Sequence, residues 1–189
     1  NSAFHDKAVS QLLDEYSFEE TDFGIWNEEK RLDFLNGELG SNRPFLPYHV
    51  DLEGEAGRVL SAYRVVREHT SKYGLNCIGS FIVSMTRSLS DLLVVYLLAR
   101  AAGLTERTEE GLECTIPVVP LLETIEDLEN GPEILQSFLS HPITKRSLAY
   151  QAKSNQGKQL QQVMVGYSDS IADSISYEYF KTYRARRND

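Results

Sequence analysis

Cysteine, methionine and tryptophan are scarce in this chain of 189 residues, which holds two, two and one of them, respectively. The two cysteines, Cys77 and Cys114, are too few for a disulfide framework, and no metal-ligand spacing links them. We therefore expect both to be buried, reduced thiols. Long apolar runs are also missing, since the longest one covers 92–99. That is far short of the roughly 20 residues that cross a bilayer, so no membrane span is predicted.

Basic residues are in deficit. The chain has 19 Lys and Arg against 28 Asp and Glu, and its formal net charge is -9. An acidic surface repels phosphate backbones, so nucleic acid is not an expected partner. Hydrophobic residues make up 41% and charged residues 25%, a balance typical of an ordinary globular protein. The N-terminus has no basic segment followed by an apolar one, and we expect a cytoplasmic protein.

Glycine-rich phosphate-binding loops are absent as well. Neither G-x-G-x-x-G nor G-x-x-x-x-G-K-[ST] follows any predicted strand, which argues against both common nucleotide-binding motifs. We find no internal repeat in the sequence.

Residues 1–74 read as a mostly helical portion. Apolar residues recur at helical spacing over 2–16 and over 53–73, where the second helix is predicted to end near Gly74. A shorter helix is expected over 27–35, with Asn27 as its cap. The glycine and two prolines of 40–47 predict a loop between these helices.

Residues 75–189 alternate between predicted strands and helices. Short apolar runs over 77–84, 114–122 and 162–166 are typical of buried strands. Ser88 with Asp91, and Thr124 with Asp127, have the spacing of helix capping boxes. We expect the first of these helices to end near Gly103, the second to break at Gly131-Pro132, and a polar connector to cover 147–158. Buried strands separated by helices predict parallel pairing, in a doubly wound sheet or in part of an eight-stranded barrel.

Two carboxylates follow predicted strands, where the functional side chains of parallel barrels lie. Glu123 comes directly after the second strand, and Asp169 follows the third by a short turn. Such a pair suits a hard divalent cation, Mg²⁺ or Mn²⁺. Pattern alone favours a plain structural role, because an acid before a helix favours the helix dipole and an aspartate is common in turns.

Several blocks of the sequence resemble phosphoenolpyruvate carboxylases. The clearest are Gly-Tyr-Ser-Asp-Ser at 166–170 and Pro-Leu-Leu-Glu-Thr-Ile-Glu-Asp-Leu at 120–128, where the family usually has Phe at the position of Leu122. Similar blocks are Ile82–Thr86 with Ser90–Leu93, then Arg43–Leu46, and Asn1-Ser2 as the end of a family motif. Their order and rough spacing also match the family, and together they cover nearly the whole chain.

The resemblance implies a segment of a helix-rich α/β enzyme, part of a (β/α)8 barrel. That family joins phosphoenolpyruvate and bicarbonate to give oxaloacetate and phosphate. It implies Glu123 and Asp169 as the ligands of Mg²⁺ or Mn²⁺, and Leu121 and Met164 as the apolar wall beside the reacting carbons. Without the family, plain core packing would explain these two apolar residues. Open strand edges in a partial barrel favour self-association, so we also expect a homo-oligomer.

The sequence departs from the family in ways that bear on activity. The family's catalytic His-Pro-Thr motif precedes the segment, its glycine- and arginine-rich phosphate loop follows it, and the similar His141–Thr144 lies in the wrong place. Within the chain, Ala172 stands where the family has Lys. We therefore expect the isolated chain to be inactive. The alternatives are a non-catalytic carboxylase-like binding or regulatory domain, and another phosphoenolpyruvate or pyruvate barrel enzyme.

Overall fold

The computed structural model describes residues 1–16, 22–46 and 53–166. Its longer helices are α1 (Ser2–Tyr16), α2 (Glu28–Gly40), α3 (Gly54–Tyr73), α4 (Leu89–Ala101), α5 (Ile125–Ser140) and α6 (Pro142–Ala152). Its strands are β1 (Phe81–Val83), β2 (Thr105–Thr108), β3 (Gly111–Cys114), β4 (Val118–Leu122) and β5 (Met164–Val165). Two short 3-10 helices cover Phe23–Ile25 and Leu75–Cys77. Within these ranges, no helix is long and apolar enough to cross a membrane.

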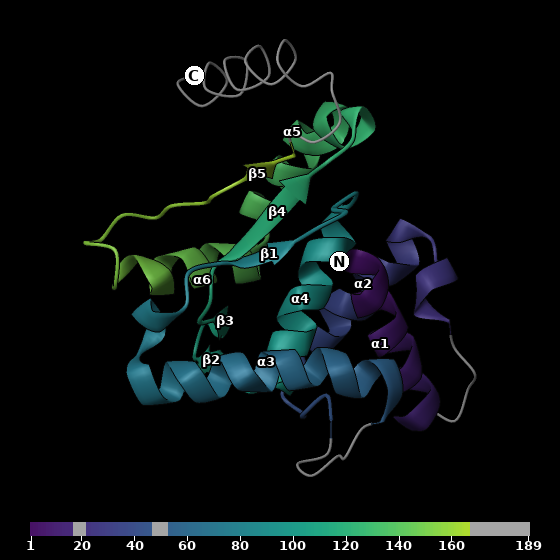
Figure 1. Cartoon of the computed structure of the whole chain (residues 1–189), viewed down its shortest axis with the longest axis horizontal. Helices are drawn as coiled ribbons and strands as arrows, with labels where there is room; N and C mark the ends of the chain where they lie inside the picture. Colours follow the sequence, from purple (N-terminus) through teal and green to yellow (C-terminus); the bar gives the residue numbers. More distant parts are fainter. Residues whose placement is uncertain (17–21, 47–52, 167–189) are drawn as a thin grey trace.

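The larger sheet has three strands in the order β1-β4-β5, and both pairings are parallel. β2 and β3 form a separate antiparallel hairpin. The helix α4 connects β1 to the hairpin, and α5 and α6 connect β4 to β5 (Figure 1). The predicted parallel pairing is confirmed, and the protein is a helix-rich α/β fold.

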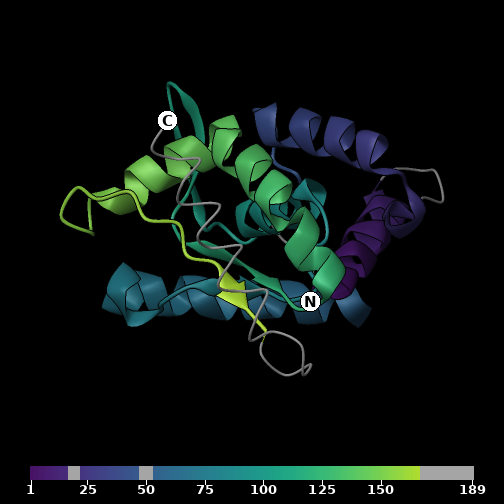
Figure 2. The same cartoon turned by 90° about the horizontal axis from the view of Figure 1, so that it is seen from above.

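Helix α4 lies at the centre of the core. Its residues 90–99 are all buried, as expected of a helix that is apolar on every side. It packs against α1, α2, α3 and α5, as well as β2, β3 and β4. Figures 1 and 2 show α3 running across most of the molecule's width below it, with the bent pair α5–α6 on the sheet side. The helical and the sheet-forming parts thus share one hydrophobic core.

The helix ends follow the predicted local chemistry. The Asn27 side chain accepts a hydrogen bond from the Lys30 amide (2.9 Å). Both capping boxes, at Ser88 and at Thr124, are formed. Gly74 and Gly103 adopt positive φ values of 84° and 76°, conformations that cost a glycine little. Helix α2 continues past the predicted end at 35 to residue 40, because Leu39 is buried one turn after Leu35.

The prediction of one strand over 114–122 is wrong. The structure divides this run between β3 and β4, with residues 115–117 between them. There the Thr115 amide donates to the Leu104 carbonyl (3.0 Å), and Pro117 has no amide hydrogen to give to a sheet. The β2–β3 hairpin was not predicted at all, since β2 is polar. The first predicted strand is likewise shorter, because 75–77 form a 3-10 helix.

Two predictions about α5 and α6 are also wrong. α5 does not break at Gly131-Pro132 but runs through it. A glycine before proline has no Cβ to clash with the ring, which removes part of the usual conflict. The predicted polar connector over 147–158 is helical up to Ala152. Its first residue, Ser147, is buried, and its hydroxyl donates to the Ile143 carbonyl (2.7 Å) and accepts from the Cys114 amide (2.8 Å).

The cysteines fit the prediction only in part. Both are free thiols, but Cys77 is exposed and only Cys114 is buried. Burial raises the pKa of the Cys114 thiol to about 12, so it stays protonated at neutral pH.

Candidate metal-binding site at the strand ends

The carboxyl ends of β4 and β5 bring two sequence blocks into contact. Glu123 directly follows β4, and Gly166 directly follows β5. The Gly166 amide donates to the Leu122 carbonyl (2.9 Å). A Cβ added to Gly166 would lie 3.3 Å from the Cα of Glu123, so only glycine allows this approach without adjustment. The Gly-Tyr-Ser-Asp-Ser block therefore begins beside Glu123, whereas Asp169 lies outside the described residues.

The carboxylate of Glu123 is held at one oxygen. Its Oε2 accepts a hydrogen bond from the backbone amide of Met85 (2.8 Å), on the loop after β1. Its own backbone amide donates to the carboxylate of Asp127 (3.2 Å), which also accepts from the amide of Thr124 (2.9 Å). Within the described residues, the bond to Met85 is the one hydrogen bond of this carboxylate, whose charge also acts on the amino group of Asn1. Both the backbone and one oxygen are thus fixed, and the side chain is half-buried.

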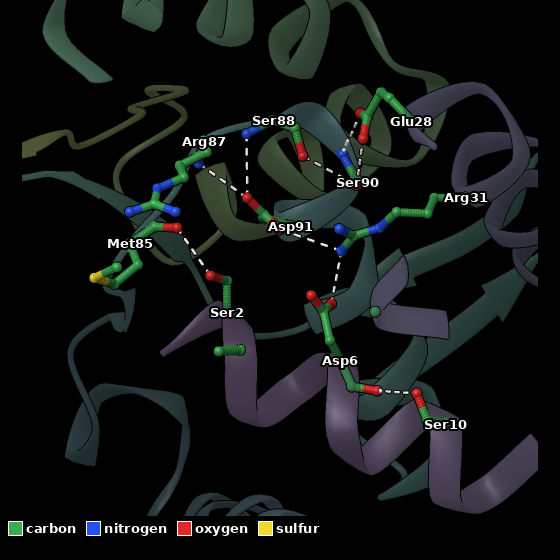
Figure 3. Close-up of polar contacts among 12 residues, drawn as sticks. Ser2, Asp6, Ser10, Glu28, Arg31, Met85, Arg87, Ser88, Ser90 and Asp91 are labelled. Carbon is green, nitrogen blue, oxygen red and sulfur yellow. Dashed lines mark hydrogen bonds and ion pairs between the residues drawn. The ribbon is translucent and has the colours of Figure 1, made fainter. Parts of the chain in front are cut away.

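Met85 holds this donor in a left-handed conformation, with φ of 60°. Such a conformation costs a non-glycine residue roughly 1–2 kcal/mol. The start of α1 holds the turn in place (Figure 3): the Ser2 hydroxyl donates to the Met85 carbonyl (2.9 Å), and the Ser2 amide donates to the Ser84 carbonyl (3.1 Å). The amide that meets Glu123 is therefore positioned by contacts from a distant part of the chain.

A buried polar network supports the other end of this turn (Figure 3). The Asp91 carboxylate accepts hydrogen bonds from the amides of Arg87 (2.9 Å) and Ser88 (3.1 Å). The Arg31 guanidinium lies between Asp91 (3.2 Å) and Asp6 (2.6 Å). Burial raises the pKa of Asp91, and it raises that of Asp6 to about 6 despite the nearby Arg31. From sequence, Asp91 was predicted only as a helix cap, because Arg31 is 60 residues away and no local pattern links the two.

Neighbouring side chains of β4 point to opposite faces of the sheet. Leu122 points toward α5, where a Cβ on Gly131 would lie 2.7 Å from its side chain. Leu121 must then point to the opposite face, because side chains alternate along a strand. Leu121 is the register partner of Met164, so the two proposed pocket residues are neighbours on that face. Met164 is 44% exposed, and Ile82 of β1 is 48% exposed. An open apolar face therefore lies next to the strand ends.

The described residues contain no group of three or more His, Cys, Asp or Glu side chains able to hold a metal ion. Glu123 brings a carboxylate to the end of β4, and carboxylate oxygens are ligands that Mg²⁺ and Mn²⁺ accept. The buried His5 is a core residue whose pKa is lowered to about 4, chiefly by burial. His141 sits at the start of α6 and hydrogen-bonds Asn36 (2.9 Å).

Comparisons with known proteins show the family of this chain. The model of the family "Phosphoenolpyruvate carboxylase" matches residues 1–188. Relatives of that name come from Mycolicibacterium paratuberculosis (34% identical), Gloeobacter violaceus (33%) and Rhodothermus marinus (35%). Each match covers 92% of this chain but only 18% of the relative. The chain thus spans less than a fifth of the length of these relatives, and it belongs to the phosphoenolpyruvate carboxylase family.

Proposed function

We propose that this chain is the part of a phosphoenolpyruvate carboxylase that holds the divalent metal ion. The reaction would join phosphoenolpyruvate and bicarbonate to give oxaloacetate and phosphate. The ion would be Mg²⁺ or Mn²⁺, with Glu123 and Asp169 as its protein ligands. The observation that carries the proposal is the contact between Glu123 and Gly166, the first residue of the block that contains Asp169.

Chain connectivity keeps the second ligand near the first. Asp169 follows Gly166 by three residues, so its Cα is at most roughly 11 Å from that of Gly166. Gly166 itself is in contact with Glu123. Two carboxylates at such a distance can reach one ion, which would complete its shell with water and substrate oxygens.

The groups at the carboxyl ends of β4 and β5 would have separate roles. The metal, when bound, would neutralise the charge that develops on an enolate or phosphate oxygen. The Met85 amide would keep one oxygen of Glu123 in place and leave the other for the ion. Leu121 and Met164 would form an apolar wall that keeps water from the reacting carbons. Their register pairing and the partial exposure of Met164 support this assignment.

The sheet would be one sector of a (β/α)8 barrel. Both of its outer strands, β1 and β5, are parallel to β4, and further strands could extend it. Unpaired strand edges favour association, so we propose a homo-oligomer or self-associated form, located in the cytoplasm. We expect the isolated chain to be inactive, because the family's His-Pro-Thr and glycine- and arginine-rich motifs are not in its sequence.

A non-catalytic carboxylase-like binding or regulatory domain is the second candidate. It is favoured by Ala172, which stands where the family has a lysine. Alanine cannot supply the point charge that a lysine brings to a phosphate group. The presence of Glu123 and Asp169 favours the catalytic assignment instead, since a binding domain needs no metal ligands.

Mn²⁺ binding measured by calorimetry tests the proposal. We expect the chain to bind Mn²⁺ and the Glu123→Gln variant to lose at least tenfold in affinity, because a neutral amide is a poorer ligand than a carboxylate. Glu126→Gln is the matched control, since Glu126 is exposed in the first turn of α5. Equal losses in the two variants, or a folded chain that binds no Mn²⁺, would favour the non-catalytic domain.

A further inference from the structure

An arginine-rich pocket lies at the C-terminal end of α4, whereas the turn at Met85 precedes the N-terminal end of this helix. Its volume is about 600 Å³, within the range of small-molecule sites. It is formed by the segment after α2, one side of α3 and the C-terminal end of α4. The residues that line it are Pro44, Phe45, Leu46, Arg64, Arg67, Glu68, Ser71, Arg100, Ala101, Ala102 and Gly103.

Helix α3 presents its polar lining at helical spacing. Counted from Arg64, the other polar residues of this lining follow at three, four and seven positions: Arg67, Glu68 and Ser71. They therefore share one face of the helix. The Arg67 side chain lies close to Gly103, where an added Cβ would be 3.0 Å from its Nε. Within the described part of the chain, no hydrogen bond or ion pair engages the Arg67 guanidinium.

Helix α4 adds a guanidinium that forms no ion pair within the described residues. Arg100 donates to the backbone carbonyls of Glu38, Ser41 and Arg43. These contacts satisfy its hydrogen bonds, but carbonyl groups carry no net charge. Burial lowers the pKa of Arg100, the nearby charge of Arg107 lowers it further, the Glu38 carboxylate raises it, and Arg43 lowers it. Arg107 also donates to the Ser41 carbonyl (2.5 Å). The guanidinium groups of Arg100 and Arg107 thus both contact the segment that follows α2.

The local charge is opposite to that of the chain. Glu68 is the one acidic residue among those that line the pocket. Glu38 lies nearby, but its carboxylate is paired with Arg43 (2.6 Å). The pocket is therefore a basic site on a chain of net charge -9. Clefts lined by one sign of charge concentrate ions of the other sign.

We propose that this pocket binds a small organic phosphate. Arg64, Arg67 and Arg100 converge on it from two helices, and guanidinium groups match the geometry and charge of a phosphate dianion. The apolar side chains of Phe45 and Leu46 would pack against the organic part of the same molecule. A pocket of this volume fits a small molecule rather than a polymer.

This site is distinct from the proposed metal site. Helix α4 separates the two, and its 13 residues correspond to a length of roughly 20 Å. Figure 1 shows it running from the loop after β1 to α3. Binding in the arginine pocket therefore requires neither Glu123 nor a metal ion.

Calorimetric titration with phenyl phosphate, in EDTA and at low salt, tests the proposal. We expect binding by the chain and a loss of at least tenfold in the Arg67→Gln variant. Arg58→Gln is the matched control, because Arg58 is on the same helix, its side chain is 80% exposed and it does not line the pocket. Glu123→Gln should bind as the unchanged chain does. Equal affinities of Arg67→Gln and Arg58→Gln, or no binding by the unchanged chain, would overturn the proposal. Loss of binding in Glu123→Gln would place the phosphate at the strand ends instead and would also overturn it.

Discussion

Replacing Arg31 by methionine would remove the guanidinium that lies between Asp6 and Asp91 in the network that supports the turn at Met85. The side chains of Arg31, Asp6 and Asp91 are 11%, 16% and 6% exposed, respectively. Arg31 contacts both carboxylates, and its guanidinium also lies over the ring of Phe23 at 4.7 Å. Methionine would keep the apolar stem and its packing, so the substitution isolates the loss of charge.

The expected cost at pH 7.5 is about 3–4 kcal/mol of unfolding free energy. Removing one partner of a buried ion pair typically costs about 3–5 kcal/mol, because the remaining charge is uncompensated. Asp91 keeps its bonds from the amides of Arg87 and Ser88, and Asp6 can become protonated, which places the estimate toward the lower end. The pKa of Asp6 is already raised to about 6. At pH 5 the cost should therefore be smaller.

Urea unfolding followed by far-UV circular dichroism measures this cost. The matched control is Arg58→Met, in which an exposed ion pair is lost and less than about 1 kcal/mol is expected. A cost below about 1 kcal/mol for Arg31→Met at pH 7.5, or a cost equal to that of the control, would refute the assigned role of the network.

Three further predictions follow from the same geometry. Because burial raises the pKa of Asp6 from its ordinary value of 3.8 to about 6, its contribution to stability is fully present below pH 3.8 and is lost as pH rises through 6. The free energy of unfolding of the unchanged chain should fall by about 1–2 kcal/mol relative to Asp6→Asn between pH 4 and pH 7.5, after a discount for partial exposure; parallel pH profiles would contradict this. Thr124→Val should cost about 1 kcal/mol, or a melting temperature lower by about 2–4 °C, because the Asp127 amide loses its acceptor; an unchanged melting temperature in calorimetry would show that the cap contributes nothing. Gly166→Ala should weaken Mn²⁺ binding by about tenfold, since its Cβ would press on the backbone of Glu123; an unchanged affinity would argue against the close approach of β5 to the metal ligand.

Local sequence signals predicted the parts of the fold that depend on local chemistry. Both capping boxes use a hydroxyl and a carboxylate three residues apart, so they can be read without knowing the tertiary structure. The parallel sheet could be predicted from buried runs separated by helices. The boundaries of the strand over 114–122 could not, because its interruption depends on a bond from Thr115 to Leu104.

The parts of the site that were missed depend on residues far apart in the sequence. Arg31 and Asp91 are 60 residues apart, and neither has a pattern that identifies the other. The amide of Met85 has no side-chain signature, yet it holds Glu123. The arginine pocket combines residues of α3 and α4 with those after α2, which only the packing of these helices brings together. Glu123 could be identified as a candidate metal ligand from its position after a strand. The assignment of Asp169 as the second ligand remains a prediction from the sequence.

The most direct test of the central claim is a double-mutant cycle in Mn²⁺ affinity with Glu123→Gln, Asp169→Asn and the double variant. If both carboxylates bind one ion, each single substitution should remove most of the affinity. The double variant should then lose much less than the sum of the two losses, because ligands of one ion are coupled. Additive losses, or an Asp169→Asn variant that binds Mn²⁺ as the unchanged chain does, would contradict a shared metal site at the ends of β4 and β5.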